Sequence, residues 1–237
     1  MSTARPPEGA RSRLAGPAAG RRPKGAPMTT ALIVFAKAPV AGTVKTRLIP
    51  ALGAAGAAAL AAWLLERTLA AGMAAGFDQV ELCVAPDTSH PAFGALAAAH
   101  RLTLTAQGVG DLGARMDRAL TRVLREHHHA VLIGTDAPAL DAARLRDAAR
   151  ALNDADAVFV PALDGGYALV GLRCAQPALF QGIAWSTGQV MAQTRERARA
   201  AGLTWIERDP LPDIDEPADL VHLPAGWTTD RATDRAT

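Results

Sequence analysis

The chain of 237 residues is short of aromatic side chains, cysteine and long apolar runs. Only ten residues are Phe, Trp or Tyr, so the core has to be built mainly from Leu, Val, Ile and the 54 alanines. Two separated cysteines, Cys83 and Cys174, exclude a disulfide framework and indicate a reducing, cytoplasmic location. No stretch approaches about 18 consecutive strongly apolar residues, so no membrane span is expected.

Lysine is also scarce, and positive charge is unevenly placed. Residues 1–27 carry a net charge of +5, which leaves −3 on the rest of a chain whose total is +2. A nucleic-acid-binding fold would carry its basic surface on the folded body, so no nucleic-acid partner is expected. The only lysines are Lys24, Lys37 and Lys45, and the last two share one short segment.

Composition divides the chain into three parts. Residues 1–27, rich in Arg, Pro, Gly and Ala, are predicted to be a disordered basic tail. Residues 28–226 are predicted to form a single domain, and residues 227–237, with repeated Thr-Asp-Arg-Ala-Thr, a second disordered tail. The basic tail lacks the apolar segment of a secretory signal.

Apolar runs alternate with helical patterns along the predicted domain. This alternation predicts βαβ units and an α/β fold whose mostly parallel sheet is covered on both faces. Two closely spaced strands around Asp164-Gly165-Gly166 indicate a hairpin or mixed-sheet element in the second half. The expected strands are 31–36, 79–85, 102–107, 130–134, 157–163, 167–172 and 203–208, and the expected helices are 53–75, 91–100, 112–127, 141–152, 187–201 and a short one from Glu216.

The loop after the first strand concentrates basic side chains. Lys37, Lys45 and Arg47 surround Gly42, which suits a turn. Ligands of open α/β sheets bind beyond the carboxyl ends of the strands, and three cations there suit the phosphates of a nucleotide. The segment is not a P-loop, and the alternative is a solvated basic loop.

Two acidic segments are candidates for a metal site. Asp136 follows the apolar strand 130–134, where a carboxylate can share Mg²⁺ or Mn²⁺ with a diphosphate. Asp215, in the segment Asp213-Ile214-Asp215-Glu216, could provide a second metal contact. The alternatives are a turn residue before Pro138 for Asp136 and a helix N-terminus for Asp215. His127, His128 and His129 are adjacent rather than spaced as metal ligands, and are expected at a solvated helix end.

Glycine-rich and aromatic segments provide the remaining candidates. Residues 108–113 match GxGxxG, but Asp111 would repel a pyrophosphate, so a loop with a helix cap is preferred, with Arg115 still available to a substrate. Asp164 could position an acceptor hydroxyl, and Trp185 could stack on a substrate; a plain turn and a capping Ser or Thr are the alternatives. The candidate substrate-binding residues are Asp111, Arg115, Gly165, Gly166, Tyr167, Trp185 and Ser186.

Six segments in this order resemble one known family: FAKAPVAGTVKTRL, GDLGARM, GTDAPAL, DGGYALVGL, WSTGQV and DIDEPADL, across residues 35–220. They are similar to a bacterial family of GT-A-fold transferases, described as glycosyltransferases of the radical-SAM/selenodomain-associated type and as a domain of unknown function. The resemblance implies a nucleotide-diphospho-sugar-transferase-like, Rossmann-like fold. It also implies a nucleotide site near Lys37, Lys45 and Arg47, and a metal on Asp136 in place of a full Asp-x-Asp, with Asp215 completing the ligand set.

Two enzymatic activities are compatible with this pattern. The first is a metal-dependent glycosyltransferase that moves a sugar from a nucleotide sugar to a small-molecule acceptor, with Asp136, Asp164 and Lys45 as catalytic residues. The second is a nucleotidyltransferase that joins an NTP to a phosphorylated small molecule, because the basic loop also resembles molybdenum-cofactor and phospholactate nucleotidyltransferases. A non-catalytic nucleotide-binding protein is the third reading, and fold alone does not decide among them.

Overall fold

The computed structural model describes residues 28–227. The predicted tail 1–27 and all but the first residue of the predicted tail 227–237 lie outside the described residues. Trp227 packs against Trp63 with ring centroids 5.7 Å apart. The packed region therefore continues through Trp227, one residue beyond the predicted boundary.

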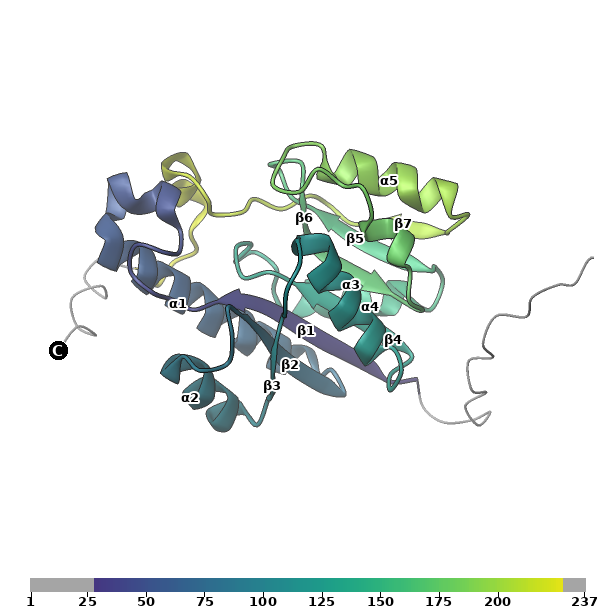
Figure 1. Cartoon of the computed structure of the whole chain (residues 1–237), viewed down its shortest axis with the longest axis horizontal. Coiled ribbons are helices and arrows are strands. Elements are labelled where there is room, and N and C mark those ends of the chain that lie inside the picture. Colours follow the sequence, from purple (N-terminus) through teal and green to yellow (C-terminus); the bar gives the residue numbers. More distant parts are fainter. Residues whose placement is uncertain (1–27, 228–237) are drawn as a thin grey trace, which may run out of the picture.

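A seven-stranded sheet organises the described residues (Figure 1). Its order is β3-β2-β1-β4-β6-β5-β7, and only β6 runs antiparallel to its neighbours. The chain extends the sheet in one direction from β1 to β3 and then returns to the other side of β1 with β4, which makes a topological switch point between β1 and β4. The strands are β1 (Thr30–Lys37), β2 (Gln79–Ala85), β3 (Thr103–Ala106), β4 (His129–Ile133), β5 (Ala157–Pro161), β6 (Tyr167–Leu172) and β7 (Trp205–Glu207).

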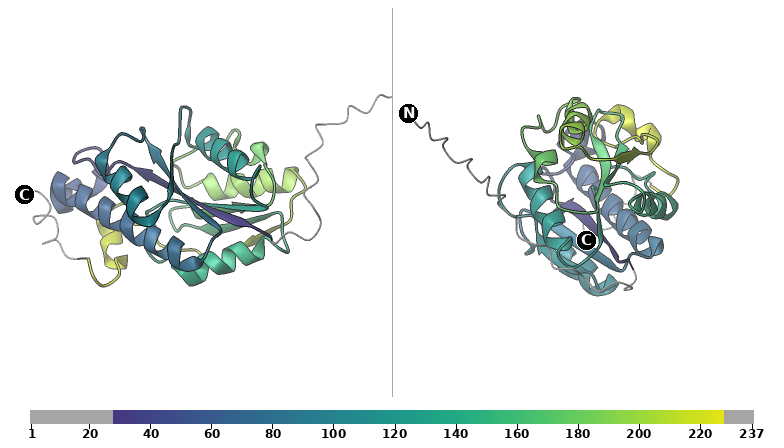
Figure 2. Two further views of the ribbon diagram at one scale, coloured as in Figure 1. Left: turned by 90° about the horizontal axis from the view of Figure 1, so that it is seen from below. Right: turned by 90° about the vertical axis from the view of Figure 1, so that its right-hand side faces the viewer.

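Helices cover both faces of this sheet, as the alternation predicts (Figure 2). Side chains of α1, α2 and α4 pack on one face, and side chains of α3 and α5 pack on the other. The helices are α1 (Ile49–Ala75), α2 (Pro91–His100), α3 (Leu112–Val123), α4 (Ala142–Ala151) and α5 (Val190–Ala200), with short 3-10 helices η1 (Thr46–Leu48), η2 (Pro177–Phe180) and η3 (Pro217–His222).

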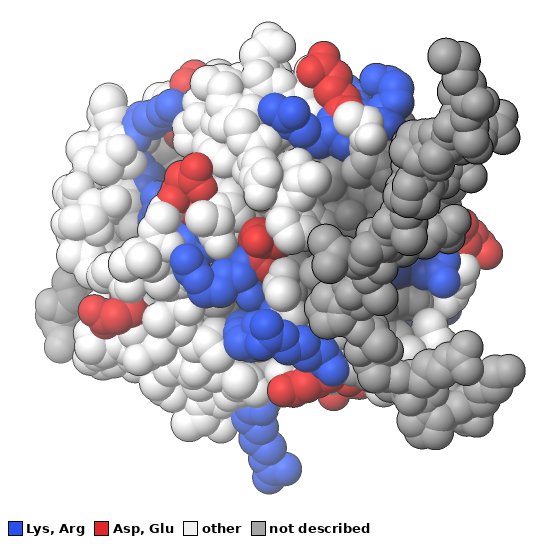
Figure 3. Space-filling model, turned by 45° about the vertical axis from the view of Figure 1, so that its right-hand side comes forward, with Lys and Arg blue, Asp and Glu red and all other residues white. Residues whose placement is uncertain are grey.

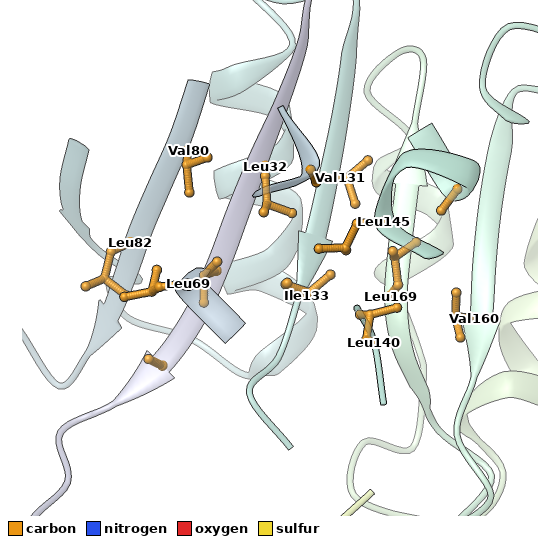
Figure 4. Packing of buried hydrophobic residues seen from close by; sticks show 14 of the residues in the cluster. Leu32, Leu69, Val80, Leu82, Val131, Ile133, Leu140, Leu145, Val160 and Leu169 are labelled. Carbon is orange, nitrogen blue, oxygen red and sulfur yellow. The ribbon is translucent and has the colours of Figure 1, made fainter. Parts of the chain in front are cut away.

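Aliphatic side chains form the core, as the shortage of aromatic residues requires. Figure 4 shows Leu32, Val131 and Leu169 projecting from neighbouring strands toward Leu69 of α1 and Leu145 of α4. All five are buried, and removal of such large apolar surfaces from water is the main force that holds sheet and helices together.

The long helix α1 has two parts. Gly53 takes a left-handed conformation (φ 70°) inside it, so the regular helix begins after this residue, close to the predicted start. Among the described residues, only the segment Thr46–Ala75 is long and apolar enough to cross a membrane by length and composition. Its Leu60, Leu64 and Leu69 are fully buried in the protein core.

The second half of the chain contains the predicted mixed-sheet element. β5 and β6 pair antiparallel across the Asp-Gly-Gly turn. After β7, an extended segment crosses the carboxyl edge of the sheet and reaches η3 beside the start of α1 (Figure 1). Backbone hydrogen bonds hold it there, from Leu211 N to Pro161 O (2.9 Å) and from Ile214 N to Asp136 O (2.9 Å).

Carboxylates cap two helices at the positions that the sequence indicates. Asp141 accepts a hydrogen bond from the backbone N–H of Arg144 at 2.9 Å, as expected for the N-cap of α4. Asp111 caps α3 in the same way, with Ala114 N at 2.8 Å. Asp111 thus has a capping role at the start of α3 and does not line the cavity described below, and its assignment to substrate binding stays a prediction.

The three adjacent histidines do not form a solvated helix end. α3 ends at Val123, and His129 is already part of β4 with 2% of its surface exposed. His128 Nδ1 accepts a hydrogen bond from Thr29 N at 3.1 Å, and His127 Nε2 lies 2.9 Å from Gln79 Oε1. Burial lowers the pKa of His129, which favours its neutral form.

Arginine side chains pair with carboxylates at several places, and on the face shown in Figure 3 basic and acidic groups lie close together. One pair has a fully buried member. Glu81 of β2 is 0% exposed and accepts hydrogen bonds from Arg122 Nη1 at 2.8 Å and from Thr105 Oγ1 at 2.6 Å. The carboxylate depends on these donors because burial removes its hydration.

We predict that Arg122→Met lowers the free energy of unfolding by about 3 kcal/mol, because it leaves the Glu81 carboxylate buried without its cation. Urea denaturation followed by circular dichroism measures this change. The double variant Glu81→Leu/Arg122→Met should recover part of the loss, since it removes the orphaned charge. A double variant less stable than Arg122→Met would contradict this explanation.

The capping role of Asp111 gives a second prediction. Asp111→Ala should lower the free energy of unfolding by about 1 kcal/mol, whereas Asp111→Ser, which keeps a capping oxygen, should lose much less. Thermal unfolding of the two variants measures the difference. Equal losses in the two variants would show that the carboxylate does something other than cap α3.

Candidate functional site

A cavity of about 650 Å³ opens at the carboxyl edge of the sheet. Its walls come from the end of β1, the residues that follow β3, β4 and β5, the start of the antiparallel β6, and the extended segment before η3. It therefore spans the β1/β4 switch point, where open α/β sheets bind ligands.

Most of the predicted site residues meet in this cavity although they are far apart in the chain. Gly42, Asp111 and Gly165 are the predicted residues that do not line it. Those that do are Lys37, Lys45, Arg47, Arg115, Asp136, Asp164, Gly166, Tyr167, Trp185, Ser186 and Asp215.

Lys45 is the most constrained of the basic residues. Its side chain is only 7% exposed, and its ammonium forms ion pairs with Asp136 Oδ1 and with Asp215 Oδ1, the latter at 3.1 Å. It also donates to the carbonyl oxygen of Ile214 at 2.5 Å. Burial opposes the charge of this amine, but the two carboxylates outweigh burial and raise the pKa of Lys45. In this arrangement the three donors of Lys45 are taken, so direct binding of a nucleotide by Lys45 stays a prediction that requires the release of one of these contacts.

The backbone at Lys45 is unusual as well. Lys45 has φ 48° and ψ 39°, a left-handed conformation that costs a non-glycine residue about 1–2 kcal/mol. Its three polar contacts compensate for this cost and fix the loop that begins η1. Gly42, three residues earlier, has φ 80° and shapes a turn of the same loop rather than lining the cavity.

The remaining cations of this loop are accessible. Lys37 is exposed at the end of β1. The Arg47 side chain is 64% exposed, and its nearest carboxylate, that of Glu216, lies 3.7 Å away. Both side chains line the cavity with donors available to an anion.

The carboxylates that line the cavity, called the acidic wall below, include Asp213, which was not among the predicted site residues. In the extended segment before η3, Asp213 and Asp215 point into the cavity, whereas Ile214 between them is fully buried against Leu48 and Leu60. Burial and the neighbouring carboxylates of Asp164 and Asp215 raise the pKa of Asp213 to about 6. The alternation Asp-Ile-Asp is the signal that could have identified Asp213, because alternate residues of an extended chain share one side.

Arg115 is held in place by a buried amide. Gln107, 5% exposed, donates from Nε2 to the carbonyl oxygens of Ala36 and Cys83, both at 3.2 Å. Its Oε1 accepts from Arg115 Nη1 at 2.9 Å. The guanidinium is thereby fixed against the ends of β1 and β2 and keeps further donors for a ligand.

The Asp-Gly-Gly turn has both structural and accessible parts. Asp164 Oδ1 accepts from Gly166 N at 2.8 Å, which leaves the other carboxylate oxygen at the cavity. Gly165 (φ 91°) does not face the cavity, because its Cα lies against the backbone of Gly188; a Cβ there would sit 2.3 Å from the Gly188 oxygen. Gly165 therefore packs the turn against a neighbouring loop, and its assignment to substrate binding stays a prediction.

Aromatic side chains form the wall next to this turn. Tyr167 and Trp185 meet edge to face, with ring centroids 6.4 Å apart. Burial raises the pKa of Tyr167, so its hydroxyl stays protonated. The indole of Trp185 packs against Gly113 of α3, where a Cβ would lie 2.7 Å from Nε1. Gly113, the last glycine of the GxGxxG match, therefore provides space for Trp185 rather than for a dinucleotide.

The donor chemistry of the acidic wall suits a hard divalent cation. Asp136 and Asp215 each leave almost half of the side chain exposed, at 48% and 44%. Carboxylate oxygens are the ligands that Mg²⁺ and Mn²⁺ prefer. Among residues 28–227, however, no three His, Cys, Asp or Glu side chains are gathered as metal ligands, so the protein offers a partial ligand set.

Solved structures show which proteins share this fold. A protein from Desulfovibrio desulfuricans G20, described as a candidate nucleotide-diphospho-sugar transferase, is 31% identical with a TM-score of 0.75, over 81% of this chain and 85% of that one. The 4-diphosphocytidyl-2C-methyl-D-erythritol synthase from Anaerococcus prevotii DSM 20548 has a TM-score of 0.56 at 9% identity, over 82% of this chain and 96% of that one. These similarities confirm the nucleotide-diphospho-sugar-transferase-like fold.

More distant similarity points to the same fold. A nucleotidyl transferase from Methanothermobacter thermautotroptrophicus has a TM-score of 0.53 at 14% identity, over 82% of this chain and 95% of that one.

No curated protein matches the sequence. A family model described as "Uncharacterized protein conserved in bacteria" (DUF2064) matches residues 68–187, which is half of the chain. The chain belongs to this bacterial family, DUF2064.

Proposed function

We propose that this protein is a nucleotide-dependent transferase that moves a sugar from a nucleotide sugar to a small acceptor. The observation that carries the proposal is the single cavity in which a basic loop after β1 faces carboxylates after β4 and before η3. Such a cavity offers separate places for a diphosphate and for its counter-ion. The similarity to the Desulfovibrio protein supports the same donor class.

Different residues along the cavity have different proposed roles. Lys37, Arg47 and Arg115 bind the phosphates of the donor. Asp136 and Asp215 would hold Mg²⁺ or Mn²⁺, which neutralises charge on the leaving diphosphate when bound. The free oxygen of Asp164 accepts the proton of the acceptor hydroxyl, whose oxygen bonds to the anomeric carbon as the bond to the diphosphate breaks.

The aromatic side chains line the part of the cavity in which the acceptor would bind. Tyr167 and Trp185 present flat apolar surfaces of the kind that pack against sugar rings and other small acceptors. Because Gly165 and Gly188 lock the two neighbouring loops together, this wall is formed before a ligand binds.

One observation favours nucleotidyl transfer as the second candidate. The block Thr135-Asp136-Ala137 lacks the second carboxylate of Asp-x-Asp, and the partner carboxylate, Asp215, comes from the C-terminal segment instead. In that reaction the same cations would bind the triphosphate, and the product released would be pyrophosphate rather than a nucleoside diphosphate.

We predict that nucleoside diphosphates with Mg²⁺ or Mn²⁺ raise the melting temperature of the protein, because ligands stabilise the state that binds them. Lys37→Ala should weaken this binding by about 10–100-fold, the loss expected for one charge-assisted hydrogen bond. Arg150→Ala, which removes an exposed charge of α4 outside the cavity, is the matched control and should bind like the wild type.

Product analysis then separates the two reactions. Incubation with a panel of nucleotide sugars and NTPs should release a nucleoside diphosphate for glycosyl transfer, and pyrophosphate for nucleotidyl transfer. If no nucleoside diphosphate alters the melting temperature and Lys37→Ala behaves like Arg150→Ala, the proposed nucleotide site is wrong.

A further inference from the structure

All three hydrogen-bond donors of the Lys45 ammonium are taken by acceptors within the protein. An ammonium has three donors, and those of Lys45 go to Asp136, to Asp215 and to the carbonyl of Ile214. Its side chain is 7% exposed, so little of it is open to a ligand. Lys45 therefore cannot bond to a phosphate until at least one of these partners is released.

The same contacts occupy the carboxylates that would hold a divalent cation. Asp136 and Asp215 share one positive charge already, which opposes the approach of a second cation between them. Two carboxylates are also too few for a complete protein-derived shell, and the described residues offer no cluster of three. Magnesium sites built on one or two carboxylates take their remaining ligands from water and substrate phosphates.

Basic side chains that line the same cavity can bind the phosphate groups of such a ligand. Lys37 ends β1 and Arg47 lies in η1, on either side of the segment that carries Lys45, and both are exposed. A diphosphate bound by them would lie in the cavity that Lys45 also lines, where its oxygens could offer new acceptors to the ammonium. A ligand that brings both a divalent cation and phosphate oxygens replaces every contact that Lys45 gives up.

We propose that Lys45 is an internal counter-ion that makes the site select a metal–diphosphate complex over either component alone. The inference rests on the proposed function and specifies the form of the ligand. In the free protein Lys45 neutralises Asp136 and Asp215. On binding, the cation takes over the carboxylates and the ammonium turns to the phosphates, so each component raises the affinity for the other by the same factor.

The experiment uses Mn²⁺ and inorganic pyrophosphate as probes with the full chain. Titration of Mn²⁺ alone, followed by the electron paramagnetic resonance of free Mn²⁺, should give at least about tenfold tighter binding to Lys45→Met than to the wild type. Arg150→Met removes a positive charge from an exposed position of α4 outside the cavity and leaves the carboxylates in place. This matched control should bind Mn²⁺ alone like the wild type.

Calorimetry on the wild type tests the coupling without any variant, which keeps the test valid if Lys45→Met does not fold. Pyrophosphate should bind at least about tenfold more tightly with saturating Mn²⁺ than in EDTA. Equal affinities in the two conditions, or equal Mn²⁺ affinities of the wild type and Lys45→Met, would overturn the inference. The proposed function would survive that result if nucleoside diphosphates still bind in a Lys37-dependent way.

Discussion

The contacts of the Lys45 ammonium are the interaction on which the site depends. They join the loop after β1, the segment that follows β4 and the segment before η3, which are distant in sequence. A lysine that is 7% exposed has lost most of its hydration, so it is stable there only because two carboxylates and a carbonyl replace the water. The left-handed backbone at Lys45 indicates that these contacts outweigh local conformational preference.

Much of the fold follows from local pattern. The apolar run 31–36 predicts the buried strand β1, Asp141 predicts the start of α4, and Asp-Gly-Gly predicts the turn between β5 and β6. These features are local, and each depends on a period of burial or on a capping side chain. Because the carboxyl ends of parallel strands meet at one edge, Lys37 and Asp136 could also be placed in one site from the sequence.

Other features depend on contacts that a local pattern does not contain. The cap formed by Asp111 could be read from its place before α3, but its position outside the cavity depends on how α3 packs on the sheet. His129 becomes a buried strand residue because α3 stops at Val123. The pairing of Lys45 with Asp215 arises only when the last segment crosses the sheet edge, so the sequence presents Lys45 as one more free cation.

A double-mutant cycle on Lys45 and Asp215 tests the central claim most directly. The free energies of unfolding of the wild type, Lys45→Met, Asp215→Asn and the double variant isolate the energy of this one pair from the other contacts of each residue. If the ammonium joins the β1 loop to the C-terminal segment, the coupling energy should be at least about 1 kcal/mol. Additive effects, within about 0.5 kcal/mol, would show that Lys45 and Asp215 act independently. That result would contradict the claim that the ammonium joins the two segments.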